Sequence, residues 1–262
     1  CANCGMVIVR WGVSGAGLAG GLATTVLHQG LAGSPDPPAA QERFGAALAV
    51  GDFNGDGYDD LAVGAPAVAL SGFYGRVEIY YGWSAGLQTE FPEYIDEAAA
   101  GGGLHVVPGS EFGTALAVGN FDHDPYDDLA LGAPLGREWQ EGGPVLRGGS
   151  VYVAHGQDWG LLPWFGYRIS QDEVEMQDFA EEGDQFGRAL AAGDFSPDSY
   201  DDLAIGVPAE DGHGMIQTLF GSQFGLIFAT NIVWFPGALG EEPEPGDRLG
   251  WNLVAGDFDG DL

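Results

Sequence analysis

One segment of the chain occurs three times, and this internal repeat restricts the fold more than any other feature. The first copy is RFGAALAVGDFNGDGYDDLAVGAP (43–66), which returns as EFGTALAVGNFDHDPYDDLALGAP (111–134) and as QFGRALAAGDFSPDSYDDLAIGVP (185–208), while RLGWNLVAGDFDGDL (248–262) begins a fourth. The acidic stretches open 63 to 74 residues apart. A long, regular period indicates an architecture in which one structural unit is copied with loop insertions.

Each unit carries short β-type runs and almost no sustained helical periodicity. In the first unit the runs are residues 47–50, 61–64 and 77–82, each bounded by Gly, Asp or Pro. A second recurring element, GRVEIYYGWSAGL (75–87), returns at 149–161 and 214–226, and residues 5–18 match it. A weaker fourth strand is predicted near 91–107, 165–171 and 227–234. Four short strands per unit predict an all-β propeller, since solenoid turns usually take only about 20 to 45 residues.

The repeat also predicts how the chain is divided. We expect one propeller segment over residues 1–262, with three complete blades and a partial blade at each end. The blades are predicted at 43–110, 111–184 and 185–247, and the partial blades at 1–42 and 248–262. Because the chain opens within one repeat and closes within another, a fragment of a longer protein is expected.

An acidic loop follows the first strand of each unit and predicts a calcium site. In the first unit, oxygen-bearing side chains occupy loop positions 1, 3, 5 and 9, and a backbone carbonyl is available at position 7: Asp52, Asn54, Asp56, Asp60 and the carbonyl of Tyr58. So many carboxylates would repel one another unless a cation lay between them. Calcium accepts six to eight oxygen ligands, whereas magnesium demands stricter octahedral geometry. One calcium ion per complete loop is predicted.

The other loops repeat the pattern with substitutions. Their predicted ligands are Asn120, Asp122, Asp124, Tyr126 and Asp128 in loop two, Asp194, Ser196, Asp198, Tyr200 and Asp202 in loop three, and Asp257, Asp259 and Asp261 in loop four. Pro125 replaces Gly57, so loop two must turn differently or bind more weakly if position 6 needs a positive φ. An EF-hand is excluded because it requires Glu at position 12, where Val63, Leu131 and Ile205 stand.

Composition limits the classes of partner. The formal net charge is −31, and all eight basic residues are Arg. Nucleic acid and anionic lipid are therefore poor candidate partners, because phosphate binding needs clustered Lys and Arg. No apolar run approaches the roughly 20 residues of a membrane helix. Cys1 and Cys4 form a lone CxxC, for which half a zinc site, a redox pair, lipid attachment at Cys1, a small local disulfide and a frayed terminal thiol pair are alternatives.

These motifs resemble FG-GAP repeats, as found in the β-propeller of integrin α subunits and in bacterial surface proteins. The matching pairs are Phe44-Gly45, Phe112-Gly113 and Phe186-Gly187, and the matching triplets are Gly64-Ala65-Pro66 and Gly132-Ala133-Pro134, with Gly206-Val207-Pro208 as a variant. The resemblance implies a calcium-stabilised recognition or adhesion scaffold, extracellular or on the cell surface. It also implies a protein or glycan ligand on the propeller face or rim, with a companion subunit or self-assembly.

Two alternative functions remain: a structural subunit of an extracellular fibre or coat, and the non-catalytic part of a secreted hydrolase. A catalytic role is not predicted, because every acidic cluster recurs in the loop register and the five histidines are scattered. Phe44, Phe112 and Phe186 are expected to wedge between blades. Trp11, Trp83 and Trp159 are expected to pack there too, leaving Trp139, Trp164 and Trp234 as glycan contacts. Asp59, Asp127 and Asp201 are expected to point outward or cap the hairpin turn.

Overall fold

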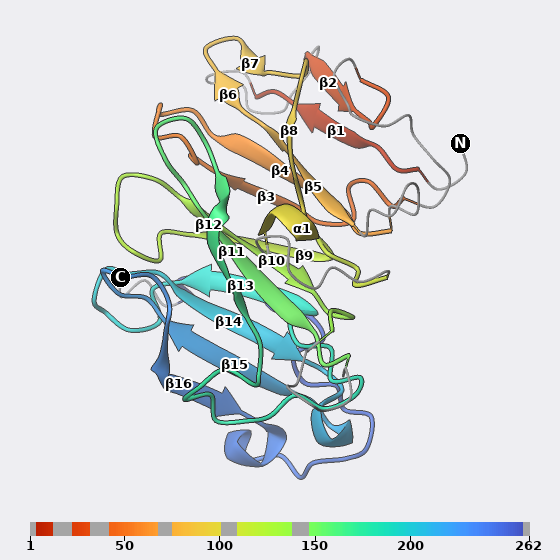
Figure 1. Cartoon of the computed structure of the whole chain (residues 1–262), viewed down its shortest axis with the longest axis vertical. Coiled ribbons are helices and arrows are strands. Elements are labelled where there is room, and N and C mark those ends of the chain that lie inside the picture. The colour runs from red at the N-terminus through yellow and green to blue at the C-terminus, as the bar shows by residue number, and fades with distance from the viewer. Residues whose placement is uncertain are drawn as a thin grey trace.

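The computed structural model describes residues 4–12, 23–31, 42–67, 75–100, 109–137 and 147–258, without the side chains of residues 163–165. Within these ranges the chain is all-β, as predicted. Three antiparallel four-stranded sheets lie one after another along the molecule, and a two-stranded pair, β1 (Val7–Arg10) and β2 (Thr24–Leu27), precedes them (Figure 1). Sheets of this kind, repeated with the sequence, are the blades of a β-propeller.

Strand order within each sheet follows chain order. The first sheet contains β3 (Leu48–Gly51), β4 (Asp60–Ala65), β5 (Arg76–Tyr80) and β8 (Glu93–Asp96). The second contains β9 (Ala115–Gly119), β10 (Asp128–Ala133), β11 (Ser150–His155) and β12 (Leu162–Ile169), and the third β13 (Ala189–Gly193), β14 (Asp202–Val207), β15 (Met215–Phe220) and β16 (Ile227–Trp234). The predicted fourth strands correspond to β8, β12 and β16.

Short elements decorate the sheets. They are a two-stranded pair of β6 (Gly82–Trp83) and β7 (Gly86–Leu87), one helical turn α1 (Glu97–Ala100), and two 3₁₀ turns, η1 (Glu210–Gly212) and η2 (Pro236–Leu239). Among the described residues no helix is long and apolar enough to span a membrane. Cys4 is disulfide-bonded, and Cys1 lies outside the described residues.

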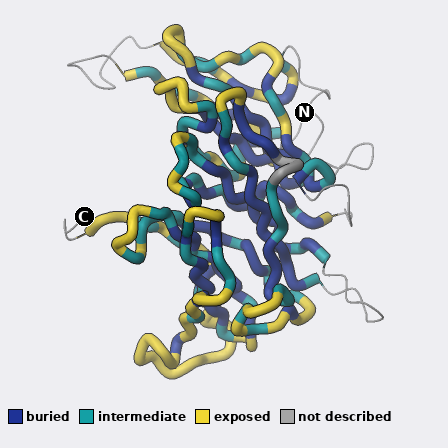
Figure 2. Tube along the Cα trace, turned by 60° about the vertical axis from the view of Figure 1, so that its left-hand side comes forward, coloured by how far each residue is buried: buried dark blue, intermediate teal, exposed yellow. Residues whose placement is uncertain are grey.

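The hydrophobic core lies between neighbouring sheets, and Figure 2 shows a buried interior along the length of the molecule. One core cluster includes Val77, Phe112 and Leu129, and a second includes Val153, Phe186 and Leu203. Phe44, Phe112 and Phe186 are all buried, and each lies where one sheet meets the previous one. The predicted wedge role of these residues is confirmed.

A close contact between backbones explains why the GAP motif and its variant need their glycine. A Cβ atom on Gly64 would overlap the carbonyl oxygen of Gly113 in the next sheet. The same overlap arises for the pairs Gly132–Gly187 and Gly206–Gly250. The strands that hold the first glycine of each pair are central strands, and β4 and β10 are buried along their whole length. Successive sheets therefore approach to a distance that only glycine allows.

The tryptophan prediction is wrong for two residues. Trp83 and Trp159 have exposed fractions of 50% and 67%, because they follow the third strand beyond the edge of the sheet and so lie outside the layer between blades. Trp11 is half-buried, and its Nε1 donates to Oγ1 of Thr25 at 3.1 Å. Trp234 is exposed at the end of β16. Trp139 and the side chain of Trp164 lie outside the described part.

Candidate metal centres

The three complete acidic loops emerge at the same edge of the molecule, on the left of Figure 1. Each connects the first and second strands of its sheet: β3 to β4, β9 to β10, and β13 to β14. The loops are thus hairpin connections, and the helices that flank an EF-hand loop are replaced by strands. This placement agrees with the sequence prediction.

Loop one (52–60) is closed by side chains that accept bonds from its own backbone. The carboxylate of Asp52 accepts from the N–H groups of Asp56, at 3.1 Å, and Gly57, at 2.8 Å. Oδ1 of Asn54 accepts from the N–H of Asp56 at 3.0 Å, and Oδ1 of Asp56 accepts from the N–H of Tyr58 at 2.9 Å. Gly57 has a φ of 84°. The predicted ligands therefore face one another across a single tight turn.

The last acid of each loop lies buried at the base of its hairpin. Asp60 accepts from the N–H of Phe53 at 3.0 Å and from the N–H of Gly82 at 2.7 Å. Asp202 likewise accepts from Phe195, Ser196 and Gly221. Burial raises the pKa of Asp60 to about 6, against the opposing effect of its backbone hydrogen bonds. A carboxylate in this position ties the loop to the end of the third strand.

Loop two (120–128) reaches a similar shape by a different closure. Pro125 has no N–H to donate to the first residue of the loop, and Nδ2 of Asn120 instead donates to the carbonyl of Asp124 at 2.7 Å. Position 4 keeps a positive φ, 68° at Gly55 and 59° at His123, while the positive φ of Gly57 at position 6 is lost at Pro125. The N–H of Tyr126 donates to Oδ1 of Asp124 at 2.8 Å, and the N–H of Asp124 to Oδ1 of Asp122 at 3.2 Å. The prediction that this loop turns differently is confirmed.

Loop three (194–202) follows loop one more closely. The carboxylate of Asp194 accepts from the N–H of Ser199 at 3.0 Å, and Ser199 has a φ of 72°. The N–H of Tyr200 donates to Oδ1 of Asp198 at 3.0 Å. The hydroxyl of Ser196, a predicted ligand, donates a hydrogen bond to Oδ2 of Asp202 at 3.3 Å. In loop four only Asp257 is described, and it is exposed, whereas Asp259 and Asp261 lie outside the described residues.

Three oxygen atoms of the predicted ligands are buried and accept no hydrogen bond from the described residues: Oδ1 of Asn120, Oδ2 of Asp128 and Oδ1 of Asp194. A buried acceptor without a donor is costly in a folded protein. Burial also raises the pKa of Asp124, Asp128 and Asp202. Oxygen atoms in this state fit a hard cation such as calcium, which would supply both a bonding partner and the missing positive charge.

Asp127 and Asp201 have a role that the sequence analysis missed. Oδ2 of Asp127 accepts from the N–H of Asp52 at 2.8 Å, and the N–H of Asp127 donates to the carbonyl of Asp52 at 3.1 Å. Asp201 makes the same pair of bonds to Asn120, at 2.8 and 3.0 Å. Only Asp59 is exposed as expected. Each of the other two acids therefore joins its loop to the loop of the preceding sheet.

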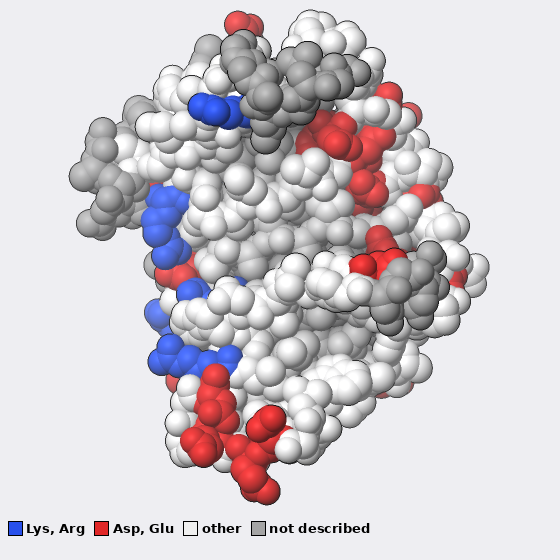
Figure 3. Space-filling view, turned by 180° about the vertical axis from the view of Figure 1, so that it is seen from behind, with Lys and Arg blue, Asp and Glu red and all other residues white. Residues whose placement is uncertain are grey.

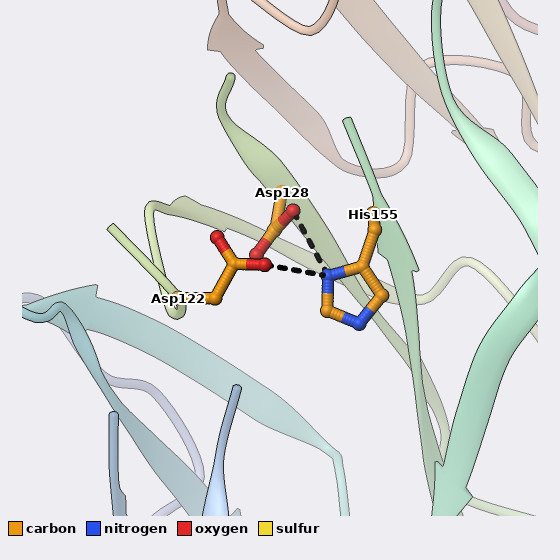
Figure 4. Close-up of side chains that lie close together, drawn as sticks. All are labelled: Asp122, Asp128 and His155. Atoms are coloured by element: carbon orange, nitrogen blue, oxygen red, sulfur yellow. Dashed lines mark ion pairs between the residues drawn. The ribbon is translucent and has the colours of Figure 1, made fainter. Parts of the chain in front are cut away.

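His155 is a further residue at the site that was not predicted, because the five histidines are scattered along the sequence. It ends β11, and its Nδ1 lies 3.2 Å from Oδ1 of Asp128 and 3.9 Å from Oδ2 of Asp122 (Figure 4). The Asp128 carboxylate raises the pKa of His155, against the effect of burial. The sequence signal is its place directly before Gly156, whose N–H donates to Asp128 at 3.0 Å.

A second acidic cluster lies at the opposite end of the strands. Glu181, Glu210 and Asp211 bring carboxylate oxygens within 4.8 Å of one another. Burial raises the pKa of Glu210 to about 8, and Nε2 of Gln171 donates to its Oε2 at 2.8 Å. The nearby Asp184 has a pKa raised to about 6 by burial. These acids belong to none of the acidic loops.

Comparison with known proteins agrees with the geometry. The model of the FG-GAP repeat family matches residues 44–80, 112–153 and 186–222. Integrin alpha-4 of Xenopus laevis is 32% identical over 177 residues, which cover 67% of this chain and 15% of the relative. Phosphatidylinositol-glycan-specific phospholipase D of Rattus norvegicus is 36% identical over 174 residues, which cover 66% of this chain and 19% of the relative. Integrin alpha-V of Gallus gallus is 30% identical over 201 residues, which cover 75% of this chain and 17% of the relative. The chain thus spans less than a fifth of each relative.

Proposed function

Because the chain is an FG-GAP repeat protein, we propose that it is a calcium-stabilised, extracellular or cell-surface recognition scaffold without a catalytic site of its own. The observation that carries this proposal is the gathering of the predicted ligand oxygens in each described loop, which in loops two and three includes buried oxygens without a donor. In loop one, calcium would be held by Asp52, Asn54, Asp56, Asp60 and the Tyr58 carbonyl. The equivalent residues of loops two and three would hold further ions, and Asp257 with Asp259 and Asp261 would contribute to a fourth site.

The hydrogen bonds between loops explain how such ions would stabilise the whole molecule. Asp127 links loop two to loop one, and Asp201 links loop three to loop two. The N–H of Gln157 in the second sheet also donates to the carbonyl of Phe53 in loop one, at 3.1 Å. A loop that is held rigid therefore holds the neighbouring blade in place. This supports a structural rather than a chemical role for the cation.

The edge opposite the loops offers a surface for recognition. Figure 3 shows Arg side chains along one edge of the molecule, with some acidic side chains beside them. Arg43 and Arg188 both contact Glu111, at 3.5 and 3.7 Å, and Arg188 and Arg248 stack on the ring of Trp251, at 4.5 and 5.0 Å. We call these five residues the arginine row. Aromatic and Arg side chains together are typical of the central contacts of protein interfaces.

The calcium part of the proposal is tested by thermal unfolding with calcium and with excess chelator. A cation that binds only the folded state stabilises it by about 2.7 kcal/mol when its free concentration is a hundred times Kd. The melting midpoint should rise with calcium, and Asp52→Ala should remove the part of this rise that comes from calcium in loop one. Identical melting curves in calcium and in chelator would refute this part.

The recognition part is tested by a binding screen against immobilised glycans and extracellular proteins. Arg188→Glu should abolish a contact made through the arginine row, while Arg10→Glu, which changes the same charge outside the row, should not. Concentration-dependent self-association without any ligand would favour a structural assembly subunit. Since the chain is 36% identical to part of a phospholipase D, turnover of a phospholipid by the chain alone would overturn the non-catalytic assignment.

A further inference from the structure

We propose that His155 is a metal ligand and makes loop two selective for a divalent transition-metal ion over calcium. The inference rests on the proposed function, because it takes for granted that the acidic loops hold cations. It assigns a different ion to one of them. Loops one and three would remain oxygen-only sites, whereas loop two would combine an imidazole nitrogen with carboxylate oxygens. Zinc, manganese and cobalt accept such mixed sets, while calcium prefers oxygen alone.

The distance from His155 to Asp128 fits two ligands of one small ion, and the distance to Asp122 is slightly longer. Ligand atoms that lie about 2.0 to 2.2 Å from a zinc ion are about 3 to 3.6 Å from one another in tetrahedral or octahedral geometry. Nδ1 of His155 is 3.2 Å from Oδ1 of Asp128 and 3.9 Å from Oδ2 of Asp122. Each of the three residues places a ligand atom within 4.8 Å of the other two. Figure 4 shows the two carboxylates and the imidazole nitrogen turned toward one another.

An ion pair between His155 and Asp128 would not explain the whole arrangement. Asp128 has an exposed fraction of 1%, and its Oδ2 accepts no hydrogen bond from any described residue. Oδ1 of Asn120, in the same loop, is also buried and accepts no hydrogen bond from any described residue. A protonated imidazole would leave both oxygens without a partner. A bound ion would engage these atoms together with Nδ1, which is a ligand only in the neutral ring.

The imidazole is held where it could bind. His155 is the last residue of β11, and its ring packs against Tyr167 with the centroids 5.8 Å apart. Tyr167 is itself fixed, because its hydroxyl oxygen accepts from the N–H of Leu226 at 3.0 Å. A metal-binding histidine whose ring is positioned by its surroundings loses little freedom on binding.

The other two sheets have no imidazole at this position. Tyr81 and Phe220 stand directly before Gly82 and Gly221, as His155 stands before Gly156. The hydroxyl of Tyr81 donates to Glu93 at 2.6 Å, so it is engaged away from loop one. The chain thus provides its own matched controls: Phe is tolerated at the equivalent position of the third sheet, and a histidine can be introduced there.

The first experiment measures binding of Zn²⁺ and Mn²⁺ by calorimetry to protein saturated with calcium. The wild type should bind one equivalent with an affinity at least about tenfold higher than His155→Phe, since even an outer-shell partner of a metal ligand is worth 10- to 100-fold. Phe220→His combined with Ser196→Asp, which places the same three ligand types at loop three, should gain a second equivalent. Equal affinity in the wild type and His155→Phe would overturn the inference, as would the lack of any gain in the double variant.

The second experiment separates direct binding from an indirect effect. Nitrogen-15 spectra of the imidazole rings should show a shift at Nδ1 of His155 on addition of one equivalent of Zn²⁺, with the other four histidines unchanged. An unchanged Nδ1 would overturn the inference even if the affinity fell. If calcium still raises the melting temperature of His155→Phe, the proposed function stands whatever the result for zinc. If neither calcium nor zinc binds, both proposals fail.

Discussion

Loops one and two occupy the same place in successive sheets, yet they are closed by opposite means. In loop one, backbone N–H groups donate to the side chain of Asp52, whereas in loop two the side chain of Asn120 donates to a backbone carbonyl. The difference follows from Pro125, which removes the N–H that Gly57 supplies. The same spacing of oxygen ligands can thus be carried by two different hydrogen-bond patterns.

The two loops also differ in how their buried acid is hydrogen-bonded. The carboxylate of Asp60 is held by two backbone N–H groups, while that of Asp128 is held by one and lies against His155. Both loops bond to the loop of the following sheet. They differ at the buried acid, which backbone N–H groups satisfy in loop one, whereas in loop two Oδ2 of Asp128 accepts no hydrogen bond from the described residues. The following predictions test that difference.

The largest effect is expected from removing the buried acid of loop one. Asp60→Ala would leave the N–H groups of Phe53 and Gly82 without an acceptor, and each buried donor left unsatisfied costs about 1 to 3 kcal/mol. Asp128→Ala removes one such acceptor and should cost about half as much. Urea denaturation in excess chelator, monitored by tryptophan fluorescence, measures both. A larger loss in Asp128→Ala would contradict the comparison.

A smaller effect is expected from Glu210, whose burial is not linked to an acidic loop. Its pKa is raised in the folded protein to about 8, so the stability contributed by the protonated form is present below about pH 4.5 and is lost as the pH rises to 8. Glu210→Gln should therefore resist urea better than wild type at pH 8, with a free energy of unfolding higher by on the order of a few kcal/mol, and should match wild type at pH 4. The gain should be the same in calcium and in chelator.

Substitutions at position 6 of an acidic loop should change the free energy of unfolding by about 1 to 2 kcal/mol. Gly57→Ala places a side chain at a φ of 84° without any steric contact, so the loss of about 1 to 2 kcal/mol would be conformational alone. The reverse change, Ser199→Gly, should relieve strain at a φ of 72° in loop three. Thermal melts of the two variants should move in opposite directions. A gain in stability for Gly57→Ala would contradict the assigned turn.

The smallest effect is expected from the links between loops. Asp127→Ala removes one hydrogen bond to the N–H of Asp52 and should cost about 1 kcal/mol. The loss should also remove the coupling between sites, so that the affinity of loop one for calcium no longer depends on whether loop two holds an ion. Asp59→Ala is the matched control, because Asp59 is exposed at the equivalent position of loop one. The same titration curve for both variants would argue against the link.

Much of the architecture could be predicted from sequence because the information was local. The hairpin loops, the buried Phe44 and its equivalents, and the turn imposed by Pro125 all follow from residues within a few positions of one another. The role of Asp127 could not be predicted in this way, since its partner Asp52 is 75 residues away. His155 likewise meets Asp128 only through the pairing of β10 with β11. The error at Trp83 arose because repetition reveals the position of a residue in a strand and not where the sheet ends.

The paired glycines between sheets, Gly64 with Gly113 and Gly132 with Gly187, bear on how such a protein grows. Each junction is made by the same two motif positions, one supplied by each unit. A newly duplicated unit would arrive with both halves of the joint already in place. The number of units could therefore change during evolution without redesign of any junction, while the segments that connect the strands remained free to diverge.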